Sequence, residues 1–294
     1  MTGLTNYAAN AALNWVTGQT PMPALPNVWL ALFTAVGTDA GTGFTEVGAG
    51  VGYTRIQVAG NLAATASFTA AVATWSMTSN PGWVVPGMSV YDTTNGFFIG
   101  TVLTYVGTTL TLTANAAHAS SGAADNLTFS MFPQGTGTAP ASSANTAAVS
   151  FAAAIGAGFG TVIAWGLYDA VTAGNLLEWD FLGNFNWLPF EMPTASGTVT
   201  AKANGYSSND PVVFTAEYGG TLPSLSTGVM TAYQISFVGT PATDTFVPNT
   251  TSGPATPFVS TSSGSGMVRK IVQQSIPAGV TASFAAASFT LTMS

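Results

Sequence analysis

From residue 27 onward the chain consists of short apolar or alternating runs separated by turn residues, and this pattern constrains the fold more than any other feature. Thr109–Thr113 alternates strictly between polar and apolar residues after a turn at Gly107 and Thr108, which is typical of a half-buried antiparallel strand. Val28–Phe33 is apolar throughout, as expected of a strand buried on both faces. We therefore expect a mainly β fold with an antiparallel, sandwich-like or jelly-roll-like core.

One helix is predicted, near the N-terminus. Five residues fall on one face of a helix: Leu4, Tyr7, Ala8, Ala11 and Trp15. Thr2 or Thr5 can cap the start of this helix, and Gly18 can end it. Prolines at positions 21, 23 and 26 prevent any continuation.

The end of the chain indicates a discontinuous core. Phe289–Met293 alternates like a half-buried strand, and a terminal strand needs partners earlier in the chain. We expect one β core made of the three pieces with the densest apolar sequence, which are residues 1–60, 140–195 and 269–294. Residues 61–133 and 196–268 are then two inserted small β modules.

The first insert has the length and strand signals of a self-contained sandwich or barrel of five to six short strands, separate from the central sheet. A polar linker, Gln134–Asn145, follows it. The second insert contains a Ser/Thr/Pro/Gly-rich loop, Pro248–Gly266. We expect the core to anchor the protein and both modules to project outward or to bridge to neighbours.

Charged residues are scarce, and this excludes whole classes of partner. The chain has 4 Lys+Arg and 11 Asp+Glu, so 5% of its residues are charged, whereas an ordinary soluble domain has roughly 25%. Nucleic-acid binding needs clustered Lys and Arg, but the basic residues are only Arg55, Lys202, Arg269 and Lys270. The absence of cysteine excludes disulfides and thiolate chemistry.

Neither membrane insertion nor a targeting segment is expected. Phe151–Tyr168 runs without a charge, but glycines interrupt it, no Lys or Arg flanks it, and Thr161–Tyr168 is typical of a buried strand. The N-terminus lacks the positively charged and apolar regions of a signal peptide.

Two groups of residues could carry hydrolytic chemistry. His118, the only histidine, lies beside Ser120 and Ser121, but no nucleophile elbow is present and the segment is typical of a surface loop. Glu178 and Asp180 are two positions apart, so they share one face of a strand and could serve glycoside hydrolysis. Their apolar neighbours favour an interface or a solvent-facing pair instead.

No catalytic, cofactor-binding or metal-binding residue is assigned, and no cofactor is expected. Asp39, Asp169 and Asp210 lie in turns, where their side chains can bond the local backbone. A calcium site would require such residues to assemble from distant loops. The aromatic residues Trp83, Trp187 and Phe97-Phe98 could bind sugars or could be core or subunit contacts.

Several motifs together resemble a tailed-bacteriophage structural family whose members are often labelled phage tail fibre protein. They are LTNYAAN (residues 4–10), VWLALFTA (28–35), TDAGTG (38–43), GYTR (52–55), WGLYDA (165–170), GNLLEW (174–179) and the segment 276–291. The two inserts also resemble small β modules common in phage proteins, through residues 86–90, 106–112 and 209–214. The resemblance implies a virion structural protein.

Three functions are consistent with these observations. The first is a non-enzymatic capsid decoration (cement) protein on the particle exterior, because uncharged β surfaces can pack without desolvating charges. The second is a tail fibre or receptor-binding protein, although no long repetitive shaft is visible. The third, with least support, is a polysaccharide-degrading virion enzyme.

The expected partners are the major capsid protein or other virion proteins and further copies of the chain, as a homotrimer. Host surface polysaccharide stays open as a further partner. The protein is expected on the virion, outside the capsid or tail, after assembly in the bacterial host cytoplasm.

Overall fold

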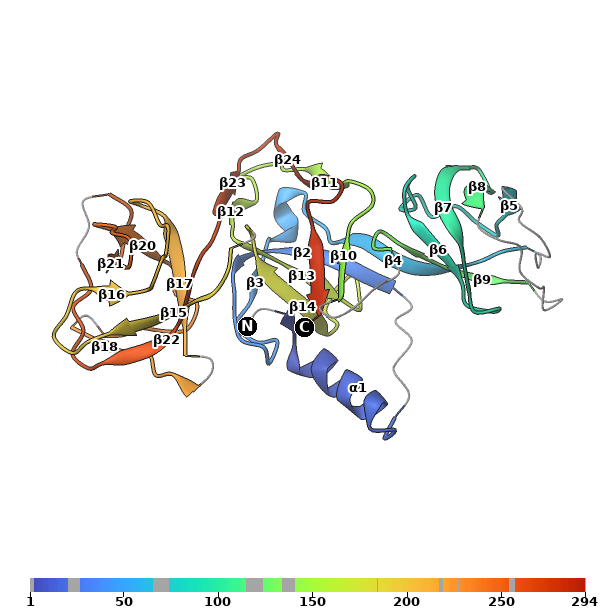
Figure 1. The fold of residues 1–294 in the computed structure, drawn as a ribbon. Helices are drawn as coiled ribbons and strands as arrows, with labels where there is room; N and C mark the ends of the chain where they lie inside the picture. The colour runs from blue at the N-terminus through green and yellow to red at the C-terminus, as the bar shows by residue number, and fades with distance from the viewer. Residues whose placement is uncertain are drawn as a thin grey trace.

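The computed structural model describes residues 3–20, 27–65, 74–114, 124–133, 141–183, 185–216, 219–226, 228–253 and 257–293. The described residues form a mainly β protein with antiparallel strand pairing and one α-helix, which confirms the predicted fold class. Three bodies lie in a row, with a central body between two β modules (Figure 1).

The central body contains strands from both ends of the chain. They are β1 (Gly3–Leu4), β2 (Asn27–Ala35), β3 (Thr45–Glu46), β4 (Ile56–Ala63), β10 (Ala141–Ala144), β11 (Val149–Ala153), β12 (Gly160–Val162), β13 (Ala164–Tyr168), β14 (Leu176–Phe181), β23 (Gln274–Ile276), β24 (Thr281–Phe284) and β25 (Thr290–Met293). A single 3-10 turn, Ala49–Val51, precedes β4 among the described residues.

The central sheet runs in the order β1-β14-β13-β2-β4, and its middle strands β13 and β2 are buried on both faces. Leu30 and Leu32 of β2 belong to one hydrophobic cluster, and Ala31 and Phe33 belong to another on the opposite face. This outcome follows from the uninterrupted apolar run in β2, since successive side chains of a strand point to opposite faces.

The C-terminal strands cover one face of the central sheet. β25 pairs with β10, β24 with β11 and β23 with β12, all antiparallel. Phe289, just before β25, packs edge-on against Trp165 of β13 with ring centroids 4.3 Å apart. The apolar segment 151–168 therefore forms parts of three strands, β11, β12 and β13.

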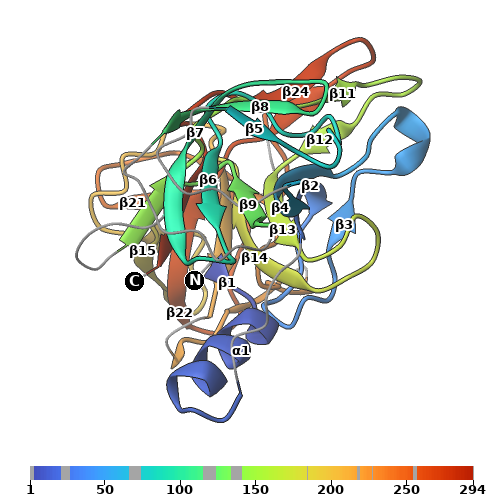
Figure 2. The ribbon, with the colours of Figure 1, turned by 90° about the vertical axis from the view of Figure 1, so that its right-hand side faces the viewer.

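The first module, seen end-on in Figure 2, continues the central sheet through β4. Its other strands are β5 (Thr74–Ser76), β6 (Ser89–Asp92), β7 (Phe97–Val106), β8 (Thr109–Ala114) and β9 (Asn126–Ser130). Ala59 and Gly60 of β4 pair with β2 on one side and with β9 on the other. A bridge between Ala64 and Met77 then brings the end of β4 close to β5, so the strands curl around one core.

This arrangement differs from the predicted separation of the first insert from the central sheet. The module does contribute strands to that sheet, because β4 is long enough for its first half to pair with β2 and its second half with β9. The predicted boundary at residue 61 falls inside β4.

The second module is a closed barrel in the order β15-β16-β21-β20-β17-β22. Its strands are β15 (Leu188–Met192), β16 (Val199–Thr200), β17 (Pro211–Thr215), β20 (Ser236–Gly239), β21 (Thr245–Asn249) and β22 (Gly264–Lys270), with a small hairpin of β18 (Ser224–Leu225) and β19 (Gly228–Val229). The barrel begins at Leu188 rather than at the predicted residue 196. Phe190 and Met192 are buried in the barrel. The prediction assigned them to the core piece 140–195 because they lie in dense apolar sequence.

The helix α1 (Asn6–Val16) projects from the central body (Figures 1 and 2). Thr5 caps its start by accepting a hydrogen bond from the Ala8 backbone N–H at 3.5 Å, and none of its residues is buried. Among the described residues, every helical segment is too short or too polar to cross a bilayer.

Candidate functional site

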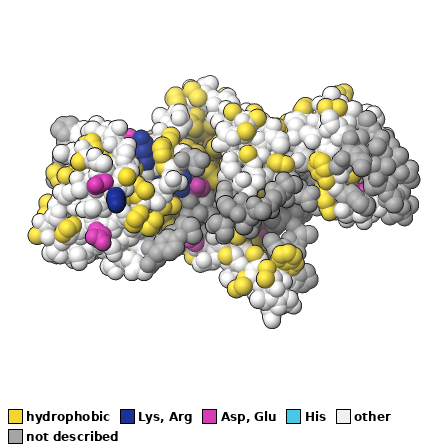
Figure 3. Space-filling view, in the orientation of Figure 1, with side chains coloured by type: hydrophobic (Ala, Val, Ile, Leu, Met, Phe, Trp, Pro, Cys, Tyr) yellow, Lys and Arg dark blue, Asp and Glu magenta, His cyan; other side chains and the backbone are white. Residues whose placement is uncertain are grey.

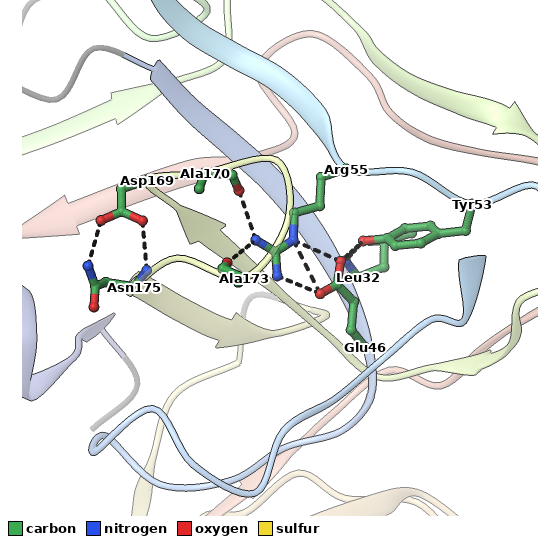
Figure 4. A network of polar contacts seen from close by, with 8 residues as sticks. All are labelled: Leu32, Glu46, Tyr53, Arg55, Asp169, Ala170, Ala173 and Asn175. Carbon is green, nitrogen blue, oxygen red and sulfur yellow. Dashed lines mark hydrogen bonds and ion pairs between the residues drawn. The ribbon is translucent and has the colours of Figure 1, made fainter.

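Motif residues far apart in the sequence converge on Arg55 (Figure 4). The Arg55 guanidinium donates to the Glu46 carboxylate, with Nη2 2.7 Å from Oε2, and to the carbonyl oxygens of Ala170 and Ala173 at 2.8 and 2.7 Å. It also lies 3.5 Å from the centroid of the Tyr168 ring. Only 8% of the Arg55 side chain is exposed. Its hydrogen bonds connect the β3–β4 region to the β13–β14 turn.

Tyr53 extends this network into the core. Its hydroxyl donates to Glu46 at 2.9 Å and accepts from the Leu32 backbone N–H at 2.9 Å. Burial, followed by the nearby Glu46 charge, raises the pKa of Tyr53 far above its ordinary value, so this hydroxyl keeps its proton. These bonds join β2, β3 and the β13–β14 turn, so the network holds the central body together.

The three turn aspartates lie apart from one another. Asp169 accepts from the backbone and the side-chain amide of Asn175, both at 2.7 Å. Asp39 accepts from the Trp179 indole N–H at 3.0 Å. Asp210 accepts from the Ser207 backbone at 2.7 Å and also pairs with a lysine. No group of three His, Cys, Asp or Glu side chains suited to a metal forms within the described ranges.

Glu178 and Asp180 line one cleft of about 330 Å³, as their spacing along a strand predicts. The cleft is lined by residues of β14, of the segment that leads into the second module, of β22 and of the C-terminal segment. Its lining residues are Trp165, Glu178, Trp179, Asp180, Phe181, Leu182, Gly183, Phe185, Arg269, Phe284, Ser288, Phe289 and Thr290.

The charge of Asp180 is neutralised by Arg269, which comes from β22 of the barrel. Nη1 of Arg269 lies 2.5 Å from one Asp180 oxygen and Nη2 lies 3.2 Å from the other. Nη2 also donates to the Gly183 carbonyl at 2.8 Å. The Arg269 side chain is 3% exposed and that of Asp180 is 30% exposed, so the pair sits at the inner end of the cleft.

Glu178 has a different environment on the same strand. Burial, and secondarily the charge of Asp180, raises its pKa to about 7. At neutral pH a large fraction of this carboxyl is therefore protonated and can donate as well as accept a hydrogen bond. Of the two acidic groups in the cleft, Asp180 is paired with Arg269, and Glu178 is only partly ionised near pH 7.

The second notable surface is α1. Its exposed large apolar residues, with the one that precedes it, are Leu4, Tyr7, Leu13, Trp15 and Val16. Residues 1–38 contain no charged side chain. In Figure 3 the apolar side chains of the helix stand on the surface, while most of the charges in view gather over the second module. Soluble proteins rarely expose such a patch without a partner.

The N-terminal end of α1 is held by hydrogen bonds to the central body, although the surface of the helix is exposed. The Thr5 hydroxyl donates to the Leu176 carbonyl at 2.5 Å, and the Thr5 backbone N–H donates to Leu177 at 2.9 Å. The Asn6 backbone N–H donates to the Asp39 carbonyl at 2.8 Å. The TDAGTG motif therefore helps to hold the helix in a defined direction.

The remaining predicted candidates fall in other places. His118, Ser120 and Ser121 lie outside the described residues. Trp83 and Trp187 are half-buried and pack against other aromatic rings, Trp83 on Phe129 in the first module and Trp187 on Phe181 and Tyr233 near the second. Phe98 is half-buried in β7, and the Phe97 side chain lies outside the described part.

Sequence reasoning did not predict the partner of Asp180 or the exposure of α1. Arg269 lies 89 residues from Asp180, and no local pattern joins the two. The charge-free stretch of residues 1–38 was a signal that could have indicated an interaction surface at the helix.

These features define a β-rich protein with a projecting uncharged helix and no metal cluster among the described residues. Residues 3–105 match the family model described as podophage GP4 fiber I protein gp80. The match covers α1, the strands up to β4 and the first module as far as β7. It supports a structural protein of the phage virion. No curated protein matches the chain.

Proposed function

We propose that the chain is a non-enzymatic structural protein of the virion exterior, acting as a capsid decoration protein. The observation that carries this proposal is the uncharged, exposed surface of α1, which is held in place by hydrogen bonds at its N-terminal end. Packing such a surface against a neighbour desolvates no charge, which would otherwise cost several kcal/mol.

The arrangement of the three bodies supports the same role. The two modules lie at opposite ends of the central body (Figure 1), so one chain can reach neighbours on both sides. Contacts of α1 with further copies would form a closed oligomer, which we expect to be a homotrimer. The remaining surface would then rest on the major capsid protein or another virion protein.

A tail fibre is the second candidate, and the family match supports it no better than the decoration role. The matched family is described as a fibre protein, and residues 3–105 contain the helix that we propose as a contact surface. Fibres often include a long shaft, but in the described part of the chain the α-helix spans only 11 residues.

The cleft gives the enzymatic alternative little support. Glycoside hydrolysis requires one carboxylate free to act as a base or nucleophile beside an acid. Asp180 is instead held in a two-point ion pair with Arg269. We therefore propose a structural role for the pair.

The test is a cryo-electron microscopy reconstruction of purified particles that carry this chain. A decoration protein predicts three-body density repeated over the capsid lattice, with α1 at a contact between copies. Density restricted to the tail would overturn the decoration role and favour the fibre. A particle with no density for the chain would contradict both.

A further inference from the structure

We propose that the cleft beside β14 binds a neutral, hydroxyl-rich ring such as a hexose unit of a polysaccharide. A purely structural role needs no such ligand, so this inference goes beyond the proposed function and does not depend on it. Size, charge, hydrogen-bonding groups and aromatic lining each support it.

The size of the cleft suits a small ligand. Its volume of about 330 Å³ is at the lower end of the range for small-molecule sites, roughly 300–1,000 Å³. It is lined by residues of β14, by residues between Phe284 and Thr290, and by Phe185 and Arg269. These residues come from the central body, from the segment that leads into the second module, and from β22 of that module.

The charge of the cleft argues against an ionic ligand. The Arg269 nitrogens Nη1 and Nη2 are bonded to Asp180 and to the Gly183 carbonyl, so an anion would compete with an existing ion pair. A cation would meet the same guanidinium. Because Glu178 is partly protonated near pH 7, it adds only part of a negative charge beside the ion pair, and a neutral ligand fits the cleft best.

The hydrogen-bonding groups match those of a sugar. A protonated Glu178 both donates and accepts, and Asp180, partly exposed, can accept a further bond. Ser288 and Thr290 also line the cleft and are exposed, and the Ser288 hydroxyl donates to the Ala285 carbonyl at 2.7 Å. Its oxygen is then oriented to accept from a ligand hydroxyl.

Aromatic rings supply the apolar part of the site. Phe284 is half-buried and packs against Phe289 with centroids 5.3 Å apart, so its position is fixed. Phe185 also lines the cleft, and the Lys270 ammonium lies 5.2 Å from its ring centroid. Small-molecule sites combine such apolar surfaces with a few placed polar groups, and the C–H face of a sugar ring is apolar enough to pack on Phe284.

The experiment is saturation-transfer NMR and calorimetric titration of the intact chain with glucose, galactose and mannose, and with glucuronic acid and glucosamine as charged probes. We expect millimolar binding of at least one neutral hexose and weaker binding of both charged sugars. Binding should weaken as the pH rises through about 7, since Glu178 then loses its donor.

Three variants locate the binding. Phe284→Ala should weaken it about tenfold, as loss of one packed aromatic contact implies. Glu178→Gln keeps an N–H donor, so it should bind within about threefold of the wild type and lose the pH dependence. Ser288→Trp adds bulk at an exposed position and should block the cleft even where Phe284→Ala fails to fold. Leu103→Ala, exposed in the first module, is the control.

Two results would overturn the proposal. One is the absence of any saccharide signal from folded wild-type chain. The other is binding that folded Ser288→Trp leaves unchanged, which would place the sugar elsewhere. Neither result bears on the location of the chain on the virion, so the failure of this inference and of the decoration role can be told apart.

Discussion

The first module is joined to the central sheet by its backbone, whereas the second module, in the described part of the chain, shares no strand with that sheet and is joined mainly by side chains. In the first junction, Ala59 and Gly60 of β4 pair with β2 and with β9 at once. In the second junction, Val213, Tyr233 and Ile271 pack in one cluster with residues of β2, β13 and β14.

This difference indicates which substitutions should weaken each junction. A backbone ladder tolerates most side-chain changes, because its N–H and C=O groups are the same for nearly every residue. A junction of packed side chains depends on a few large residues and, here, on the partly buried ion pair Asp180–Arg269. Substitutions should therefore loosen the second module more readily than the first.

The largest effect is expected for Trp179→Ala. Trp179 is fully buried at the second junction, where its ring lies 5.3 Å from that of Tyr233. Removing it should lower the free energy of unfolding by about 3–5 kcal/mol, measured by urea denaturation. Trp15→Ala, the same change on exposed α1, should cost less than about 0.5 kcal/mol. Equal losses would contradict the packing account.

Removing either partner of the Asp180–Arg269 ion pair should lower the free energy of unfolding, but by different amounts. Asp180→Ala leaves the buried Arg269 charge without its carboxylate and should cost about 3 kcal/mol. Arg269→Met leaves the more exposed Asp180 able to take up water, so the loss should be about half as large. Denaturation of both variants and of the double variant measures the coupling. A larger loss from Arg269→Met would reverse the assignment of the buried partner.

Glu178 should make stability depend on pH. Its pKa of about 7 in the folded chain lies above the ordinary 4.5, so the folded chain holds a proton that the unfolded chain releases. This contribution is complete below pH 4.5 and is lost as the pH rises through 7.

The loss should be about 2 kcal/mol between pH 5 and 8, less than the full pKa difference implies because the carboxyl is partly exposed. Denaturation of wild type and Glu178→Gln across this range isolates the contribution. If the two curves are parallel, Glu178 is not the group responsible.

The first junction should be most sensitive at Gly60. A Cβ there would lie 2.3 Å from Nε2 of Gln57 and 2.7 Å from Oδ1 of Asn27, which hydrogen-bond to each other. Gly60→Ala should cost about 1–2 kcal/mol and increase hydrogen exchange in β9 but not in β17. Gly48→Ala, with open space around its Cβ, is the control. Faster exchange in both modules would show that the junctions are not independent.

The smallest effect on stability is expected on α1, which belongs to neither junction. Leu13→Ser should change the free energy of unfolding by less than about 0.5 kcal/mol, because Leu13 is exposed. It should nevertheless lower the molar mass in solution, measured by light scattering after size exclusion. An unchanged oligomer would remove α1 from the proposed contact, and a monomeric wild type would do the same.

Local patterns in the sequence predicted much of the fold. Alternation located strands such as β8, the apolar run placed β2 between two layers, and the spacing of Glu178 and Asp180 placed both in one cleft. Each of these depends only on the period of a strand and on burial.

The remainder depends on contacts between distant residues. No local pattern tells that one half of β4 pairs with β2 and the other half with β9. The pairing of Asp180 with Arg269, and hence the low net charge of the cleft, has the same origin. The apolar residues of a helix do not indicate whether they pack against the same chain or against another one. The exposure of α1 could therefore be learned only from the structure.

The most direct test of the account is the copy number of this chain relative to the major capsid protein, measured by quantitative mass spectrometry of purified particles. A capsid decoration protein predicts a ratio near one, or a simple fraction such as one third. A few to a few tens of copies per particle would contradict that role and place the chain at the tail or at a single vertex.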